Sequence, residues 1–395
     1  MDVQSPVQVL LILAAATLAG WVRIRLGHAA PPSGRFASLD GLRGYLALCV
    51  FAHHACIWYF YLHGGTWLHP TANFYSNLGS TGVALFFMVT GFLFYTKLLD
   101  SAGKELDWGR LFVSRVTRIV PLYAFTMLAL FAIVFWLSKG QLREPLTELS
   151  QNVLTWVAFT TRGMPNINEV PGTFLIVAGV TWSLPYEWLF YFALPLLGLV
   201  THTRASRAYL AFSVIATATM LLLILRPPQI VTFLGGILAA HAVRDERFRK
   251  LAGTHWASCV VLACLTANLF LFPKSNGPIQ LALLTTAFAL MAGGASLFGL
   301  LVTPAARVLG EVSYSIYLLH GLVLFIAFKF VLDRSVLTAL SAQGYWLVVV
   351  ALTPLLVAAC CVTFATIEHP AMQSTTQVTG WLRRLLGAWR LQLQR

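Results

Sequence analysis

An arginine and a histidine in one apolar stretch have a spacing that could support chemistry. Arg43 and His54 lie within residues 38–54, eleven positions apart. In an α-helix this separation is about 16 Å along the axis and three turns plus roughly 20°, so the two side chains share one face that His53 does not. Ionisable groups at membrane depth usually face a cavity or a polar partner. The pattern therefore indicates a site with a cation at its mouth and an imidazole at depth. The structural alternative is a hydrogen bond from His54 to another helix and a snorkelling Arg43.

A second cluster of cations follows at residues 108–121. It contains Arg110, Arg115 and Arg118, and the last two are three residues apart, which places them on one face of a helix. Guanidinium groups bind phosphate through paired N–H donors. We expect the cluster to lie at the same membrane surface as Arg43 and to hold the phosphates of a donor molecule. Ordinary contact with lipid phosphates is the alternative.

An acidic residue among aromatic side chains is the third feature. Glu187 follows Trp182, Ser183 and Tyr186 at the expected start of an apolar helix, on the extracytoplasmic side. A carboxylate there could act as a general base or bind the hydroxyl groups of an acceptor, and aromatic surfaces often accompany sugar sites. An interfacial belt of aromatic residues with a solvated carboxylate is the alternative.

Two weaker patterns lie nearer the C-terminus. Tyr317 and His320 are three residues apart inside an apolar run, so a helix places them close together, either to bind an acceptor or to pack. Glu368 lies at the end of the last apolar run, and we favour a structural role for it. The six cysteines all fall in apolar runs and show no metal-ligand spacing, so we expect no metal site.

The elements that must position these residues are apolar helices. Hydrophobic residues make up 58% of the 395 residues and charged residues 10%, with a mean hydropathy of +0.75, which excludes a soluble globular domain. Segments of about 20 apolar residues cross a membrane as helices. Residues 150–180 are ambiguous, and they are typical of a re-entrant or interfacial piece. The sequence therefore predicts an all-α, polytopic transmembrane helix bundle of about eleven spans, at 5–22, 44–62, 80–97, 119–138, 184–201, 208–225, 229–243, 253–272, 279–301, 312–331 and 345–366.

The positions of lysine and arginine predict the orientation. Most of the 27 Lys and Arg residues fall in loops on one side of the membrane if the N-terminus is outside and the C-terminus is cytoplasmic. The tail at 381–395 alternates Trp and Leu with Arg, which is typical of a helix lying on an anionic membrane surface. The net charge of +13 is thus explained by topology and lipid contact rather than by nucleic-acid binding, for which no aromatic-basic platform is present.

Taken in order along the chain, these features resemble the acyltransferase-3 family of integral membrane O-acyltransferases. The resemblance covers residues 35–370, after an extra N-terminal transmembrane helix and linker at 1–34 and before a basic amphipathic tail at 371–395. One such block would be weak evidence, but five in order are specific. The blocks are Leu39–Gly44 followed by His54, Gly82–Phe92 with Thr90 where serine is commoner, Arg115 and Arg118 with Pro121, Trp182–Glu187, and Ser313–His320.

The resemblance implies a ten-helix core, to which the first helix is an addition, and a reaction. An acyl-CoA donor, most often acetyl-CoA, would enter from the cytoplasm with its phosphates on Arg43, Arg115 and Arg118. His54 would activate an acceptor hydroxyl or carry the acyl group, and Glu187 would orient or deprotonate the acceptor from the outer side. The implied protein is an O-acyltransferase of the bacterial inner membrane, in contact with membrane lipids, that acylates a cell-envelope or exported glycan.

A transporter or flippase for a hydrophobic metabolite or a lipid-linked sugar is the alternative function. It predicts internal repeats, and none is apparent in the sequence. The sequence carries no signal for a particular oligomeric state.

Overall fold

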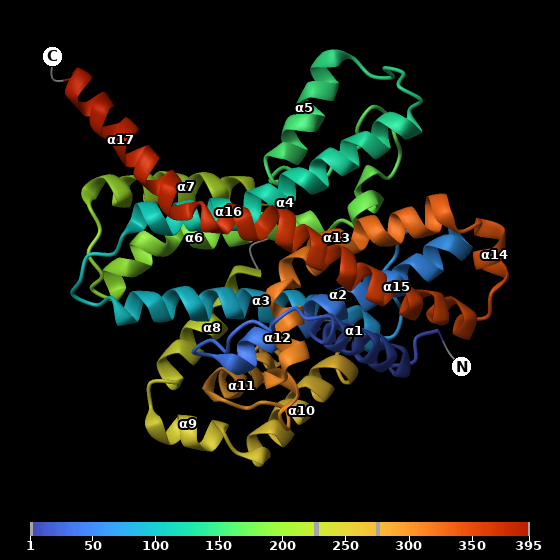
Figure 1. The fold of residues 1–395 in the computed structure, drawn as a ribbon, viewed down its shortest axis with the longest axis horizontal. Coiled ribbons are helices and arrows are strands. Elements are labelled where there is room, and N and C mark those ends of the chain that lie inside the picture. Colours follow the sequence, from blue (N-terminus) through green and yellow to red (C-terminus); the bar gives the residue numbers. More distant parts are fainter. Residues whose placement is uncertain (1–2, 225–228, 274–276, 394–395) are drawn as a thin grey trace.

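The chain folds into helices throughout the part that the structure describes. This computed structural model describes residues 3–224, 229–273 and 277–393, and Figure 1 shows their arrangement. The predicted all-α fold is confirmed for these residues. The three predicted domains each include a few residues outside this description, and their boundaries stay predictions.

The helices differ in length and type. In the list that follows, η1, η2 and η4 are 3-10 turns, whereas η5 and η6 are π-helical turns. In chain order they are α1 (Val7–Arg25), α2 (Ala37–Gly64), α3 (Asn73–Asp100), α4 (Trp108–Leu137), α5 (Leu146–Val157), η1 (Thr173–Val177), η2 (Val180–Ser183), α6 (Leu184–Val200), α7 (Arg207–Leu223), α8 (Ile230–Ala242), α9 (Glu246–Ala252), α10 (His255–Phe270), α11 (Pro278–Gly293), η4 (Leu300–Val302), α12 (Pro304–Glu311), α13 (Ser313–Ile326), η5 (Ala327–Val331), α14 (Arg334–Ala339), α15 (Ala342–Thr363), η6 (Phe364–Glu368), α16 (His369–Gln373) and α17 (Thr375–Leu393).

Each predicted apolar run overlaps one of these helices, but the helices are not equally long. Within the described residues, seven helical stretches are long and apolar enough to cross a membrane, or eight if α9 and α10, bent by 76°, form one span. The apolar helices α7, α8 and α11 have 17, 13 and 16 residues. The number of eleven spans and the orientation of the termini therefore stay predictions.

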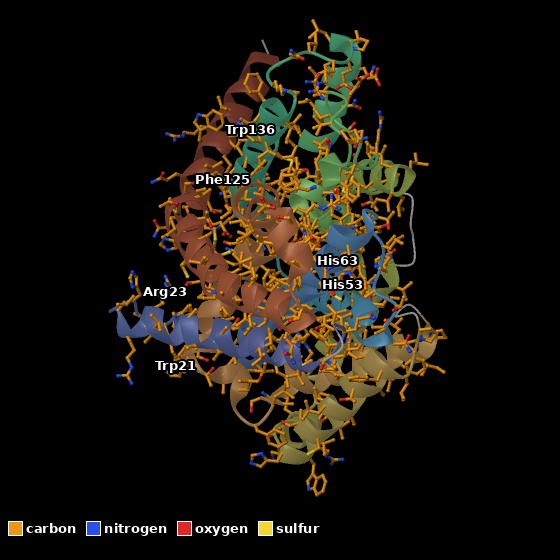
Figure 2. All side chains as sticks on the ribbon, turned by 90° about the vertical axis from the view of Figure 1, so that its right-hand side faces the viewer. Trp21, Arg23, His53, His63, Phe125 and Trp136 are labelled. Atoms are coloured by element: carbon orange, nitrogen blue, oxygen red, sulfur yellow. The ribbon has the colours of Figure 1, made fainter. Side chains whose placement is uncertain are left out.

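Large apolar side chains cover the outside of the bundle. Trp21, Phe125 and Trp136, labelled in Figure 2, are 39%, 41% and 65% exposed. Exposed apolar surface on long apolar helices suits contact with lipid tails rather than with water.

The helix α2 lies at the centre of the bundle, between α3 and the pair α12 and α13 (Figure 1). Glycines let it approach α12 backbone to backbone. A Cβ atom on Gly310 would lie 1.6 Å from the carbonyl oxygen of Asp40, and one on Gly44 would lie 2.5 Å from the Cβ atom of Leu309. Gly44 of the Leu39–Gly44 motif and Gly310 of α12 therefore allow close packing between α12 and the first half of α2, the half that we predict to lie toward the cytoplasm.

The ambiguous segment before α6 turns into the bundle. Its turns η1 and η2 pack against α13, where a Cβ atom on Gly321 would lie 2.3 Å from the carbonyl carbon of Val177. Thr173, Val177 and Thr181 have no exposed surface. The chain thus enters the protein interior before α6 begins, so the first residues of α6 lie among other helices and not at its edge.

Candidate active site

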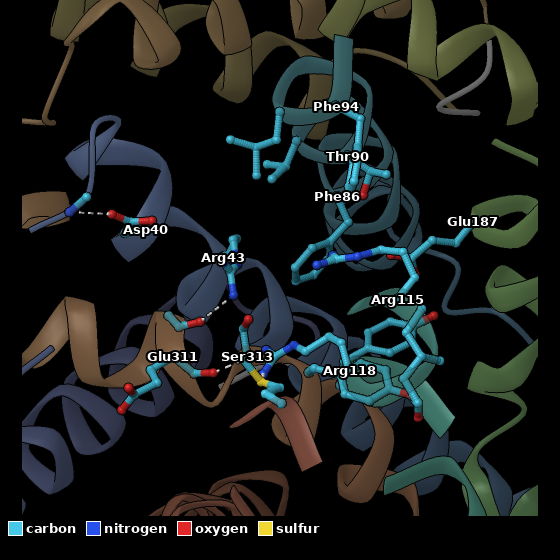
Figure 3. A pocket seen from close by; sticks show the side chains of 18 of the residues that line it. Asp40, Arg43, Phe86, Thr90, Phe94, Arg115, Arg118, Glu187, Glu311 and Ser313 are labelled. Atoms are coloured by element: carbon cyan, nitrogen blue, oxygen red, sulfur yellow. Dashed lines mark hydrogen bonds between the residues drawn. The ribbon is translucent and has the colours of Figure 1, made fainter. Parts of the chain in front are cut away.

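Two adjoining cavities lie beside α2, and the first collects most of the charged residues that the sequence singled out. This first cavity, called here the arginine cavity, has a volume of about 610 Å³. Arg43 lines it from α2, Arg115 and Arg118 from α4, and Glu187 from α6. Figure 3 shows these side chains around one space. The fold therefore brings together three arginines that come from two helices.

Two of the three arginines keep their charge free for a ligand. The guanidinium of Arg43 donates a hydrogen bond to the carbonyl oxygen of Gly310 at 3.1 Å. Arg115 lies over the rings of Phe94 and Tyr191, 4.9 and 5.9 Å from their centroids. Among the described residues, neither Arg43 nor Arg115 has a carboxylate within ion-pair distance. Both positive charges are available to an anion.

The third arginine, Arg118, forms an ion pair with Glu368, the residue for which the sequence favours a structural role. The carboxylate of Glu368, with no exposed surface, lies 3.2 Å from Arg118 and also accepts a hydrogen bond from the hydroxyl of Ser315. Arg118 further donates to the carbonyl oxygen of Glu311 at 3.4 Å. Glu368 ends the π-helical turn η6, and such turns are frequent at functional sites. Its structural role is thus to position a cavity arginine.

The N-terminal helix contacts a residue that lines the same cavity, and the linker after this helix lines it directly. The carboxylate of Glu311, which lines the cavity at the end of α12, lies 3.8 Å from the guanidinium of Arg23 in α1. Burial raises the pKa of the Glu311 carboxyl above its ordinary value of 4.5, and Arg23 opposes that shift. Pro31, Pro32 and Gly34 of the following linker also line the cavity. The segment before the motif-bearing core is therefore part of the cavity wall.

Glu187 does not lie where the sequence analysis placed it. We expected it on the outer side, with His54 between it and the arginines, but it lines the arginine cavity beside them. The reason is that the preceding segment turns into the bundle, so α6 begins inside the protein. The carboxylate of Glu187 accepts a hydrogen bond from the hydroxyl of Tyr191, one turn further along α6. The expected order of arginines, His54 and Glu187 across the membrane is wrong.

The second cavity, called here the histidine cavity, has a volume of about 520 Å³. His54 lines it from α2, and Trp182 and Tyr186 line it from η2 and α6. The ring of Trp67 stacks on His54 with 6.3 Å between centroids. Trp67 gives no signal in the sequence because it lies in the loop after α2, where no helical period relates it to His54. Aromatic walls beside an imidazole suit a partly apolar molecule that carries hydroxyl groups.

Three side chains line both cavities and form the wall between them: Val83, Phe87 and Tyr317. The hydroxyl of Tyr317 lies 3.0 Å from the carbonyl oxygen of Val180 and 2.8 Å from the hydroxyl of Ser183. Because a carbonyl oxygen only accepts, Tyr317 donates a hydrogen bond to Val180, and the Ser183 hydroxyl also donates to that oxygen at 3.3 Å. These contacts tie α13 to η2, the turn that leads into α6, and they fix one side of the wall.

Two of the sequence candidates, His54 and His320, meet where α2 packs against α13. Nδ1 of His54 lies 3.0 Å from Nε2 of His320 and 3.1 Å from the carbonyl oxygen of Val50. Nδ1 of His320 lies 3.0 Å from the carbonyl oxygen of Ile316. An imidazole that lines a cavity and has a free nitrogen lone pair can accept the proton of a hydroxyl group bound there.

Most of the chain matches the model of one protein family. Residues 36–365 match a family described as an acyltransferase domain, and the protein belongs to this family, acyltransferase-3. The acyltransferase MdmB of Streptomyces mycarofaciens is 31% identical over 173 residues, which are 41% of this chain and 39% of that protein. Nodulation protein 10 of Rhizobium leguminosarum bv. viciae is 27% identical over 389 residues, which are 89% of this chain and 97% of that protein. No solved structure matches the chain.

The family and the long apolar helices together define the class of protein. It is a multi-pass membrane enzyme that transfers acyl groups. The match begins at residue 36, so α1 and the linker that lines the arginine cavity precede the family region. In the described residues, no group of three or more His, Cys, Asp or Glu side chains is arranged to hold a metal ion.

Proposed function

We propose that this protein is an acyl-CoA-dependent O-acyltransferase of the bacterial cytoplasmic membrane. In this proposal acetyl-CoA is the donor, and a hydroxyl of a cell-envelope or exported glycan is the acceptor. The observation that carries the proposal is the pair of adjoining cavities, one cationic and one aromatic, the second lined by His54 with His320 in contact behind it. Acyl transfer needs one site for each substrate, and the two cavities offer them on either side of one thin wall.

The arginine cavity supplies the chemistry that would recognise the donor. Arg43 and Arg115 face it with no carboxylate of the described residues within ion-pair distance, and Glu368 fixes the position of Arg118. Guanidinium groups form short, charge-assisted hydrogen bonds to phosphate oxygens, and CoA carries several phosphates. With the phosphates held there, the thioester end of the donor would point along the cavity toward Phe87 and Tyr317.

His54 is assigned the role of general base. Its Nε2 takes the proton of the acceptor hydroxyl as the oxygen attacks the thioester carbonyl carbon. The carbon–sulfur bond then breaks, and the CoA thiolate leaves and receives the proton from His54. In the second route, Nε2 attacks the thioester carbon and the CoA thiolate leaves; the acceptor hydroxyl then attacks the acyl carbon, the bond from that carbon to Nε2 breaks, and the hydroxyl proton passes to the thiolate. Both routes require a lone pair on the same nitrogen.

Glu187 keeps a place in the proposal, but on the donor side. Its carboxylate holds the hydroxyl of Tyr191, and Arg115 lies over the ring of that tyrosine. We assign Glu187 to the shape and charge of the arginine cavity. The transporter alternative gains no support, because the family match concerns acyl transfer and one relative is named as an acyltransferase.

The test combines donor binding with analysis of the product. The detergent-purified protein is titrated with acetyl-CoA, and envelope glycans of cells with and without the gene are compared by mass spectrometry. His54→Ala should bind acetyl-CoA and add no acetyl group to any glycan. Arg43→Ala should bind acetyl-CoA about tenfold more weakly or worse, since a hydrogen bond to a charged group contributes roughly 1.5–3 kcal/mol.

Matched controls separate these effects from general damage. His63 lies at the C-terminal end of α2 and is exposed. Like His54, it contacts a carbonyl oxygen of its own helix: its Nδ1 lies 2.8 Å from the carbonyl oxygen of Tyr59. Arg249 is exposed on α9. His63→Ala and Arg249→Ala should behave as wild type. Full acyl transfer by His54→Ala, or a wild-type protein that does not bind acyl-CoA, would refute the proposal.

A further inference from the structure

We propose that His320 is a positioning residue that keeps the proton of His54 on Nδ1 and leaves the Nε2 lone pair free for the acceptor hydroxyl. This inference rests on the proposed function, because it gives His320 a task in the reaction only if His54 is the base. The observation behind it is the contact between Nε2 of His320 and Nδ1 of His54 at 3.0 Å.

The proton on His320 is placed by its own helix. His320 has no exposed surface, and its Nδ1 lies 3.0 Å from the carbonyl oxygen of Ile316. A carbonyl oxygen has only lone pairs to offer, so Nδ1 must carry the hydrogen of this bond. In a neutral imidazole the other nitrogen then has a lone pair. His320 therefore presents an acceptor, Nε2, to its neighbour.

The proton on His54 follows from that acceptor. Two lone pairs at 3.0 Å would repel each other, so Nδ1 of His54 must donate to Nε2 of His320. The two rings suit such a bond, because their planes differ by 27° with 5.1 Å between centroids, and an N–H points along its ring plane. The lone pair of His54 is thereby left on Nε2, the nitrogen that the proposed reaction uses.

The contribution of His320 differs from that of the second acceptor, the carbonyl oxygen of Val50. That oxygen belongs to α2, the helix that carries His54. A bond to it therefore cannot fix the position of the His54 ring relative to the other helices of the site. His320 comes from α13, whose face is tied by Tyr317 to Val180. It therefore fixes the His54 ring relative to the wall that separates the two cavities.

The bond also becomes stronger as the reaction proceeds. When His54 takes the proton of the acceptor, its ring becomes a cation and the bond from Nδ1 to His320 becomes charge-assisted. An interaction that strengthens between ground state and transition state raises the rate, not only the affinity. His320 would act as the carboxylate does beside the histidine of a serine protease, but without a buried negative charge.

A buried histidine that only packs α13 against α2 is the competing explanation, and two variants of similar size separate the two roles. In His320→Gln, the side-chain oxygen can still accept the Nδ1 proton of His54, whereas in His320→Met a weakly accepting sulfur replaces it. We expect His320→Met to lower kcat for acyl transfer about 100-fold or more, with little change in the KM for acetyl-CoA. The kcat of His320→Gln should be at least tenfold higher than that of His320→Met.

The outcomes are decisive in either direction. Acetyl-CoA binding should stay at the wild-type affinity in both variants, because the arginine cavity lies beyond the wall; this shows that the protein is folded. If His320→Met does not fold, His320→Leu takes its place in the comparison with His320→Gln. Equal activity of the Gln variant and the apolar variant, whether high or low, would overturn the role of His320. Activity retained in His54→Ala would instead overturn the proposed function itself.

Discussion

A single methyl group on α2 tests whether close helix packing holds the donor site. In Gly44→Ala, the new Cβ atom would lie 2.5 Å from the Cβ atom and 2.6 Å from the carbonyl carbon of Leu309, and 2.8 Å from the backbone nitrogen of Gly310. Two of these atoms are backbone, so no side-chain rotation relieves the contact. Ordinary carbon contacts are about 3.5–4.0 Å, which means that α12 must move by roughly 1 Å.

The size of the effect follows from two opposing terms. An alanine in a helix interior is favoured over glycine by roughly 0.5–1 kcal/mol, whereas overpacking of this kind costs about 1–3 kcal/mol and sometimes more. We therefore expect a net loss of stability of about 1–2 kcal/mol. A movement of roughly 1 Å would also break the 3.1 Å bond from Arg43 to the carbonyl oxygen of Gly310, so acetyl-CoA affinity should fall as well.

The assay is thermal unfolding of the detergent-purified protein together with acetyl-CoA titration. Gly64→Ala is the matched control on the same helix, where the nearest atom to a new Cβ is the Thr66 hydroxyl oxygen at 4.0 Å. The control should unfold at or slightly above the wild-type temperature and bind normally. A Gly44→Ala protein that matches the wild type in both measurements would refute the argument that this contact positions Arg43.

Three further predictions concern the wall between the cavities and two acids that pair with arginines at the arginine cavity. Phe87→Ala should shift the preference from acetyl-CoA toward butyryl-CoA in a competition assay, because it opens the wall between the cavities; an unchanged ratio contradicts this role. Glu368→Gln should lower stability by roughly 3 kcal/mol in chemical unfolding, since it leaves Arg118 without its buried partner, and wild-type stability would exclude that pairing. Burial raises the pKa of Glu311 in the folded state above the ordinary value of 4.5, so above pH 4.5 the folded state keeps a proton that the unfolded state loses. This residue therefore makes stability fall as the pH rises from 4.5 through the folded-state pKa. Glu311→Gln should flatten the dependence of the unfolding temperature on pH above 4.5, and an identical slope would argue against it.

The helical spacing of residues in the sequence predicted several of the side chains that line the two cavities. The spacing of Arg43 and His54 and that of Arg115 and Arg118 are properties of a single helix, and an apolar helix offers no other regular structure for those residues. The sequence therefore singled out, without any knowledge of packing, three arginines that line one cavity, and each predicted apolar run overlaps a helix. The order of motifs along the chain led to the family, which the match over residues 36–365 confirms.

Contacts between helices decided the rest. Trp67 reaches His54 from a loop, and Glu368 reaches Arg118 from 250 residues along the chain, so no period relates either pair. The position of Glu187 was predicted wrongly because a span was expected to start at the membrane surface. The preceding turns instead fill the interior against Gly321, a place that is open only because a glycine has no side chain.

The sequence by itself determined that this is a helical membrane protein, which residues share a helix face, and which family it belongs to. Those properties depend on composition and on neighbours within a few turns, and the bilayer leaves the backbone little choice. Only the tertiary structure decided that three arginines and Glu187 share one cavity, that His54 faces another, and that His320 lies against its Nδ1. These arrangements depend on how closely the helices approach, and that distance is set by glycines and buried polar pairs on different helices.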